Sequence, residues 1–200
     1  MWTLHKKTVV ALFITGLFLS PQSFATSIKK MDLAEMSTMA DSIIVGRCTS
    51  VKTEWVGNKI FTKSTIQIND HIKGDGNNSI DITSIGGTAI HPTLKVPVTM
   101  SVGGGLSFKL DEEVVLFTKS RPGGINQVIG MSMGKFEVRT DKSTGKKHVP
   151  FSQKILDVMP PGTFTPKERK DGRRVDKTLK PRDLDLDEFI TKIREHVRKK

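Results

Sequence analysis

One serine in this chain stands in a pattern that hydrolases use. Residues 130–134 read Gly-Met-Ser-Met-Gly, which matches the Gly-x-Ser-x-Gly nucleophile elbow with Ser132 as the nucleophile. An elbow joins a strand to a helix, whereas residues 135–138, Lys-Phe-Glu-Val, predict a strand. Asp157 and His196 follow in the chain order that such a triad uses. A serine hydrolase is therefore one alternative, but we expect the glycines to act as backbone joints.

The other patterns that suggest chemistry are incomplete. The Ser-x-x-Lys match at residues 27–30 precedes any core, and the glycines at residues 103–105 lack the lysine and helix of a phosphate loop. Four histidines are scattered along the chain, with no paired spacing on one helix and no cysteine beside them, which argues against a metal site. We therefore expect no catalytic residue, no metal and no cofactor. The histidines concerned are His71, His91, His148 and His196.

Cys48 is the only cysteine, so no intramolecular disulfide can form and the core must hold the fold. Its neighbours Val45, Gly46 and Val51 indicate a strand, where a cysteine usually behaves as a small buried hydrophobe. A reactive thiol is the alternative, although no histidine lies near it in sequence to activate it.

The N-terminus has the layout of an export signal. Lys6 and Lys7 precede an apolar run over residues 9–19, which is shorter than the ~20 residues that span a bilayer. Ser23 and Ala25 are small residues at the positions that signal peptidase reads, which predicts cleavage after Ala25. We expect a periplasmic or secreted protein with no transmembrane segment in the mature chain; an uncleaved anchor is the alternative.

Positive charge is concentrated near the C-terminus. The net charge is +11, and residues 167–200 hold thirteen Lys and Arg against eight Asp and Glu. Residues 157–182 are basic, rich in proline and poor in apolar residues, which indicates a linker or extended arm. An acidic protein or envelope polymer fits this charge, and a merely solvated surface is the alternative. The residues proposed to bind that partner are Lys167, Arg169, Lys170, Arg173 and Arg174.

Aromatic residues give little support for nucleic-acid binding. The chain has no tyrosine and two tryptophans, so it offers few platforms on which single-stranded bases could stack. We expect no specific nucleic-acid partner. Trp55, beside a predicted hairpin tip, is a candidate contact residue, with capping of the core edge as its alternative.

The strands that must position these residues centre on residues 113–118. Apolar side chains alternate onto both faces there, Val115 and Phe117 against Val114 and Leu116, which indicates a central strand covered on both sides. A Pro-Gly-Gly turn follows, with return strands expected over residues 125–129 and 135–139 as a meander. Other predicted features are a hairpin at Gly57-Asn58, strands over residues 43–52, 60–72 and 80–85, and a long loop, functional or mobile, over residues 86–108.

Two helices flank the strands. Asp32 and Glu35 form a capping-box pattern before a short helix, and Asp185 and Glu188 repeat it before a second. The second carries an apolar stripe that we expect to dock on the barrel, with a partner as the alternative. The fold prediction is mainly all-β: an antiparallel OB-like barrel. Its divisions are a signal peptide (1–25), barrel (26–156), arm (157–182) and C-terminal helix (183–200).

Several segments together resemble a family of exported bacterial proteins of unassigned function. Its patterns are Ala-Asp-x-Ile-Val-x-Gly, a Val-Leu-Lys-Gly turn, Gly-Glu-Glu-Val-Leu-Leu-Phe and Val-x-Gly-x-x-x-Gly-Lys-Phe. Asp111 stands where that family usually has glycine. The layout is also similar to netrin-like, tissue-inhibitor OB-fold domains, whose N-terminal cysteines are absent here. Both resemblances imply a barrel. The matching segments are residues 40–46, 71–74, 108–117 and 128–136.

The functional prediction is an exported, non-enzymatic binding or accessory protein with a basic arm. A netrin-like protease inhibitor, which would insert an exposed edge or loop into a catalytic cleft, is the first alternative. The hydrolase on Ser132 is the second.

Overall fold

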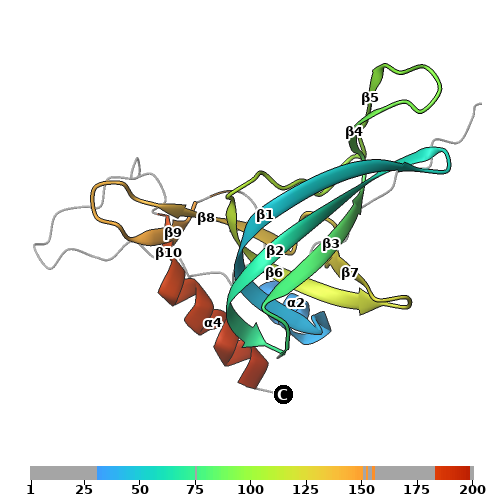
Figure 1. Cartoon of the computed structure of the whole chain (residues 1–200). Helices are drawn as coiled ribbons and strands as arrows, with labels where there is room; N and C mark the ends of the chain where they lie inside the picture. Colours follow the sequence, from blue (N-terminus) through green and yellow to red (C-terminus); the bar gives the residue numbers. More distant parts are fainter. Residues whose placement is uncertain (1–30, 75, 151, 153–154, 156–182, 199–200) are drawn as a thin grey trace, which may run out of the picture.

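The computed structural model describes residues 31–74, 76–150, 152, 155 and 183–198 (Figure 1). Strands dominate this part of the chain, with one helix near each end. In chain order the elements are α2 (Leu33–Met39), β1 (Ser42–Val56), β2 (Lys59–Lys73), β3 (Ser79–Ile85), β4 (Gly87–Ile90), β5 (Pro97–Met100), β6 (Glu113–Arg121), β7 (Ile125–Val128), β8 (Lys135–Thr140), β9 (Lys147–Val149), β10 (Leu184–Asp185) and α4 (Leu186–Arg198).

Five strands close into a ring in the order β1, β2, β3, β7, β6, and β6 pairs back with β1. All of these pairings are antiparallel except β3 with β7, which meet in parallel at Ile82 and Asn126. A small closed five-stranded ring is the architecture of an OB-like barrel. The predicted fold, mainly β with a short N-terminal helix and a C-terminal helix, is confirmed.

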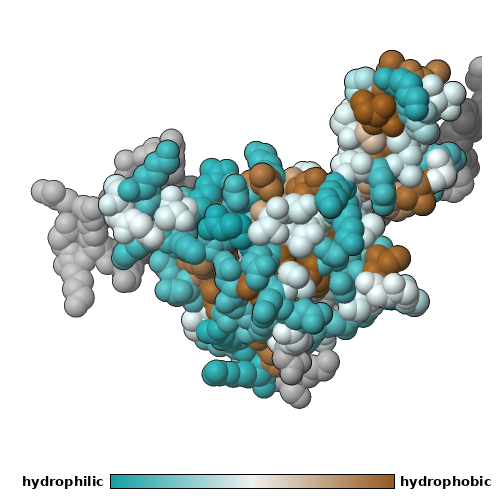
Figure 2. Space-filling model, in the orientation of Figure 1, coloured by the Kyte–Doolittle hydropathy of each residue, from teal (hydrophilic) through white to brown (hydrophobic). Residues whose placement is uncertain are grey.

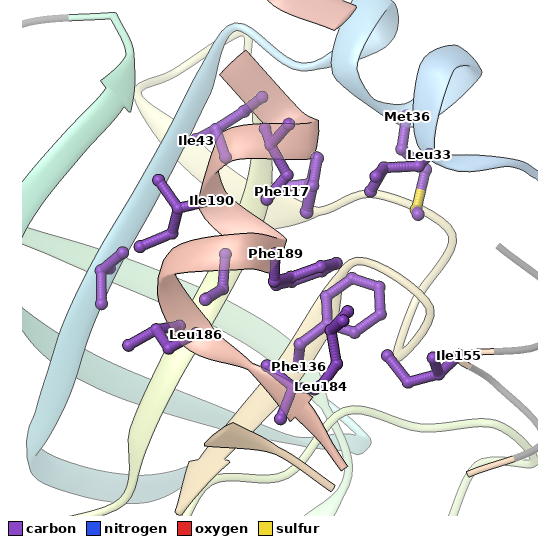
Figure 3. Close-up of a cluster of buried hydrophobic side chains, with 14 of the residues drawn as sticks. Leu33, Met36, Ile43, Phe117, Phe136, Ile155, Leu184, Leu186, Phe189 and Ile190 are labelled. Atoms are coloured by element: carbon purple, nitrogen blue, oxygen red, sulfur yellow. The ribbon is translucent and has the colours of Figure 1, made fainter. Parts of the chain in front are cut away.

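The central strand β6 separates two apolar clusters, as its alternation predicts. Val114 and Leu116 belong to a cluster inside the ring, to which every ring strand contributes. Val115 and Phe117 belong to a second cluster outside the ring, between its wall and the helices. In that outer cluster Phe136 packs edge-on against both Phe117 and Phe189, with ring centroids 5.8 and 5.0 Å apart (Figure 3).

The return from β6 is not the meander that we predicted. β7 and β8 both pair with β6, one with its C-terminal half and the other with its N-terminal half. They are two parts of one neighbouring strand, interrupted by residues 130–134. Phe117 bridges the interruption, because its N–H donates to the Gly134 oxygen and its oxygen accepts from the Ile129 N–H, both at 2.9 Å. The glycine-rich segment therefore bulges out while the sheet continues behind it.

The predicted loop over residues 86–108 is also different in the structure. It contains a separate two-stranded hairpin, β4 with β5, held by four residue pairs from Gly87–Met100 to Ile90–Pro97. Pro97 begins β5, a position where a proline does not interrupt the ladder. The sequence did not predict this hairpin, because Pro92 and Pro97 suggest a loop and strands of four residues show too few alternations to recognise.

Both helices begin at the predicted caps. The Glu35 N–H donates to the Asp32 carboxylate at 2.7 Å, and the N–H groups of Asp187 and Glu188 donate to the Asp185 carboxylate. Residues 184–185, directly before α4 in the C-terminal segment, pair with β9 as β10. The α4 stripe docks on the molecule as expected, since its main apolar residues are buried: Leu186, Phe189, Ile190 and Ile193.

The two helices and the β4–β5 hairpin lie at opposite ends of the barrel. Figure 1 shows α2 and α4 together at one end, and β4–β5 projecting from the other beside the tip of the β1–β2 hairpin. We call these the helix end and the hairpin end. β1 and β2 run the whole distance between them.

Candidate functional site

Most of the predicted partner-binding residues lie outside the described residues. This holds for all five basic arm residues and for the cleavage position Ala25. Trp55 is described, and it lies on β1 at the hairpin end. No helix among the described residues is long and apolar enough to cross a membrane.

The residues that carry the family resemblance serve the scaffold. The Asp41 carboxylate accepts the Ser120 N–H at 3.0 Å and so ties the start of β1 to β6. Gly46 has no room for a side chain, because a Cβ there would lie 2.5 Å from the Gln67 oxygen on β2. The Lys73 ammonium donates to carbonyls at the C-terminus of α2, among them that of Ser37 at 2.8 Å. This cation suits the negative end of the helix dipole.

Two adjacent glutamates of the same pattern form salt bridges to neighbouring strands. Glu112 binds the Lys135 ammonium at 2.7 Å, and Glu113, almost fully buried, binds Lys147 at 2.6 Å and Arg47 at 3.4 Å. Asp111 adopts a φ of 63°, in the left-handed region where glycine is the easiest residue and aspartate is tolerated. The family pattern is thus explained by folding requirements.

Ser132 lies in the bulge between β7 and β8, so a strand follows it where an elbow has a helix. Cys48 is buried inside the ring, and burial raises the pKa of its thiol, which disfavours the reactive thiolate. Within the described ranges, no group of three or more His, Cys, Asp or Glu residues is placed to hold a metal ion.

Trp55 marks the joint between the two hairpins. Its ring lies edge-on to that of His91, with centroids 5.1 Å apart and an interplanar angle of 71°. The His91 Nδ1 in turn accepts the N–H groups of Thr93 and Leu94, at 3.2 and 3.1 Å. Trp55 is half-buried and belongs to neither apolar core cluster. The structure therefore places it as a support for the second hairpin, a role that the sequence did not suggest.

Close backbone packing fixes the β4–β5 hairpin against β1 and β2. The Thr62 hydroxyl donates to the Gly86 oxygen at 2.6 Å, and the Gly86 N–H donates to the Ile60 oxygen at 2.8 Å. A Cβ on Gly87, whose φ is 129°, would lie 2.5 Å from the Thr62 hydroxyl and 2.7 Å from the Thr53 methyl. Only glycine allows this approach, so the Gly86-Gly87 pair is a fixed joint.

The hairpin carries apolar side chains that nothing in the described structure covers. Leu94 is 66% exposed, Ile90 58% and Val96 48%. Sequence reasoning missed these residues because it treated the segment as a loop. A signal was present in the composition, since residues 86–108 contain Lys95 as the single cation and contain no Asp or Glu.

The chain matches no family model, and no curated protein or solved structure is significantly similar to it. The resemblance to exported bacterial proteins stays a hypothesis, and the site rests on its own geometry.

Proposed function

We propose that this protein is an exported, non-enzymatic binding or accessory protein whose partner is anionic, an acidic protein or an envelope polymer. The observation that carries the proposal is uncompensated positive charge. The chain has 32 Lys and Arg against 21 Asp and Glu, and many of the carboxylates are already neutralised by neighbouring cations. Carboxylates with a lysine or arginine partner are Asp70, Asp81, Glu112, Glu113, Glu137 and Glu188.

The lysines at the hairpin end have no such partners. Lys59 and Lys95 form no salt bridge with any described residue, and neither does Lys52 further along β1. Glu54 is the single carboxylate among residues 52–63, against three lysines, of which only Lys63 has a salt-bridge partner, Asp81. Together with the basic arm, these lysines supply a positive field that attracts an anionic partner without disturbing the core.

Export is part of the proposal. Lys6, Lys7 and the short apolar run support cleavage after Ala25 and a periplasmic or secreted location. The intact mass of the protein recovered from the envelope or the medium decides it. A chain that begins at Thr26 is expected, and a retained Met1 would contradict the proposal.

The binding itself is tested by removing the charge of the arm. We expect that changing Lys167, Arg169, Lys170, Arg173 and Arg174 to serine abolishes binding to an acidic polymer and leaves the melting curve unchanged. A variant with lysine at all five positions is the matched control, because it keeps the charge. Binding should also fail at ~1 M salt, where the Debye length is about 3 Å. Undiminished binding by the serine variant would refute the role of the arm.

A netrin-like protease inhibitor is a second candidate, and the projecting hairpin favours it. Its six-residue tip, residues 91–96, is braced and exposed, as an element that enters a catalytic cleft must be. Dose-dependent inhibition of a protease panel, lost on Leu94→Ser, would support this candidate over the first. Turnover of ester substrates that disappears on Ser132→Ala, with folding intact, would instead revive the hydrolase.

A further inference from the structure

Exposed apolar residues gather on one projecting part of the molecule. Among the described residues, eleven large hydrophobic residues are exposed, and five of them lie on or beside the β4–β5 hairpin: Ile85, Ile90, Leu94, Val96 and Val102. Val56, 54% exposed, lies at the tip of the neighbouring β1–β2 hairpin. Figure 2 shows hydrophobic surface on the projecting hairpin, whereas the visible face of the barrel body is mostly hydrophilic. Such a concentration on and beside one hairpin indicates an interaction surface.

Most backbone N–H groups at the hairpin tip form hydrogen bonds within the tip. The N–H of His91 donates to the Val96 oxygen at 2.8 Å, and that of Lys95 donates to the His91 oxygen at 3.0 Å. The N–H groups of Thr93 and Leu94 are taken by the His91 Nδ1. The prolines at positions 92 and 97 have no N–H to satisfy. Four of the five N–H groups of residues 91–96 are therefore bonded within the tip, which lowers the cost of moving it into the interface of a bilayer.

The charge of the tip indicates which kind of apolar surface it would bind. Lys95 stands between Leu94 and Val96, and residues 86–108 contain no carboxylate that a negatively charged surface would repel. Lys59 on the adjacent hairpin adds a second cation. Apolar side chains at an apex with lysines beside them are the combination that binds the interface of an anionic bilayer, where the ammonium groups meet headgroups and the apolar groups meet acyl chains.

We propose that the β4–β5 tip docks this protein on an anionic lipid bilayer by inserting Leu94 and Val96, with Ile90 behind them, into the interface. The Gly86-Gly87 joint and the Trp55–His91 contact hold the hairpin away from the barrel so that the tip reaches the surface first. This inference goes beyond the proposed function, because it adds a lipid bilayer as an anionic partner that the hairpin contacts, whereas the proposed function concerns the arm.

The experiment measures binding to vesicles. The exported, processed protein, its mass verified, is sedimented with vesicles of equal phosphatidylglycerol and phosphatidylcholine, and with vesicles of phosphatidylcholine alone. Burying a Leu or Val side chain contributes enough that the Leu94→Ser/Val96→Ser variant should bind the anionic vesicles at least about tenfold more weakly. Trp55 is the only tryptophan after residue 25, so a blue shift of its emission reports that the hairpin end is engaged.

The matched control removes equally exposed apolar groups elsewhere. Leu110 is 63% exposed and Ile125 43% exposed, and neither lies on the two hairpins. The Leu110→Ser/Ile125→Ser variant should bind vesicles as the wild type does. If the tip variant fails to fold, Lys95→Glu replaces it, because this charge reversal should weaken binding to the anionic vesicles without removing an apolar group.

The outcomes separate this inference from the proposed function. Equal binding by the tip variant and the control variant would overturn the inference, as would wild-type protein that ignores anionic vesicles or binds neutral ones equally well. A tip variant that binds vesicles as the wild type does but no longer self-associates would also overturn the inference. In that case the tip would bind a second copy of the chain. The proposed function fails on a different result, namely polymer binding that survives the five-serine change.

Discussion

The helix end and the hairpin end use the same two long strands for opposite purposes. At the helix end, Ile43 on β1 is fully buried against the outer cluster. At the hairpin end of the same strand, Val56 is exposed, and the β4–β5 hairpin beside it adds Leu94 and Ile90. One end is therefore closed by α2 and α4, while at the other no described residue covers the apolar groups of the braced hairpin. The proposed binding surface is thus separated in space from the core at the helix end, so a change at one end should leave the other largely unaffected.

The largest contrast is expected from truncating one apolar side chain at each end. Phe117 is fully buried beside Phe136, so Phe117→Ala should lower the free energy of unfolding by about 3–5 kcal/mol. Val115→Ala should cost somewhat less, in the range of about 2–4 kcal/mol. Leu94→Ala, at an exposed position, should change it by less than about 0.5 kcal/mol. Urea denaturation measures all three. A large effect at Leu94 would show that the hairpin belongs to the core.

Adding a methyl group tests close packing at the two ends. Gly46→Ala places a Cβ 2.5 Å from the Gln67 oxygen and 2.7 Å from Ile66, so we expect destabilisation of about 1–3 kcal/mol. Gly103→Ala, in the loop after β5, meets nothing within 4 Å and should be nearly neutral. Thermal melting of the two variants gives the comparison. Equal melting temperatures would mean that β1 and β2 separate at Gly46 at no cost.

A lysine at each end provides a test of charge. Lys73→Met removes the cation that binds the C-terminal carbonyls of α2, and should destabilise by about 1–2 kcal/mol. Lys59→Met removes a lysine without a salt bridge among the described residues, and should leave stability unchanged while weakening anionic binding. Denaturation and polymer binding measured on both variants separate the two roles. Loss of binding in Lys73→Met with full stability would reverse the assignment.

The smallest expected effect concerns an ion pair between β2 and β3, in the part of the barrel between the two ends. Hydrogen bonds from Lys63, at 2.8 Å, and from Thr65 lower the pKa of Asp81 on β3. A lowered pKa in the folded state gives stability that is present above the unfolded pKa of about 3.9 and is lost as the pH falls through the folded value. Because the pair is well exposed, the contribution is small.

Unfolding of wild type and Asp81→Asn should therefore be compared between pH 7 and pH 2. The wild type is expected to be slightly more stable at neutral pH, and the difference should vanish at the acid end. A difference in stability that grows as the pH falls would contradict the predicted direction of the pH dependence.

Several features of this molecule were determined locally, and the sequence was sufficient for them. Alternating apolar residues over 113–118 fixed both faces of β6, because strand side chains alternate whatever lies on either side. Asp32 and Asp185 predicted the helix starts, since each cap bonds N–H groups only two or three residues away. Gly57-Asn58 placed the β1–β2 turn. The docking of the α4 stripe followed from the cost of leaving it exposed.

Other features depended on contacts between distant residues, which only the tertiary structure decided. Closure of the ring needs Ile82 beside Asn126 and Ser42 beside Thr118, and no local pattern encodes those partners. β7 and β8 share one edge of β6 because Phe117 bonds across the bulge, whereas their sequences suit a meander equally well. The hairpin end required the Gly87 approach to Thr62 and the Trp55–His91 contact. Sequence periodicity reports which face of an element is buried, but the neighbour that buries it, or leaves it uncovered, is chosen by packing across the whole fold.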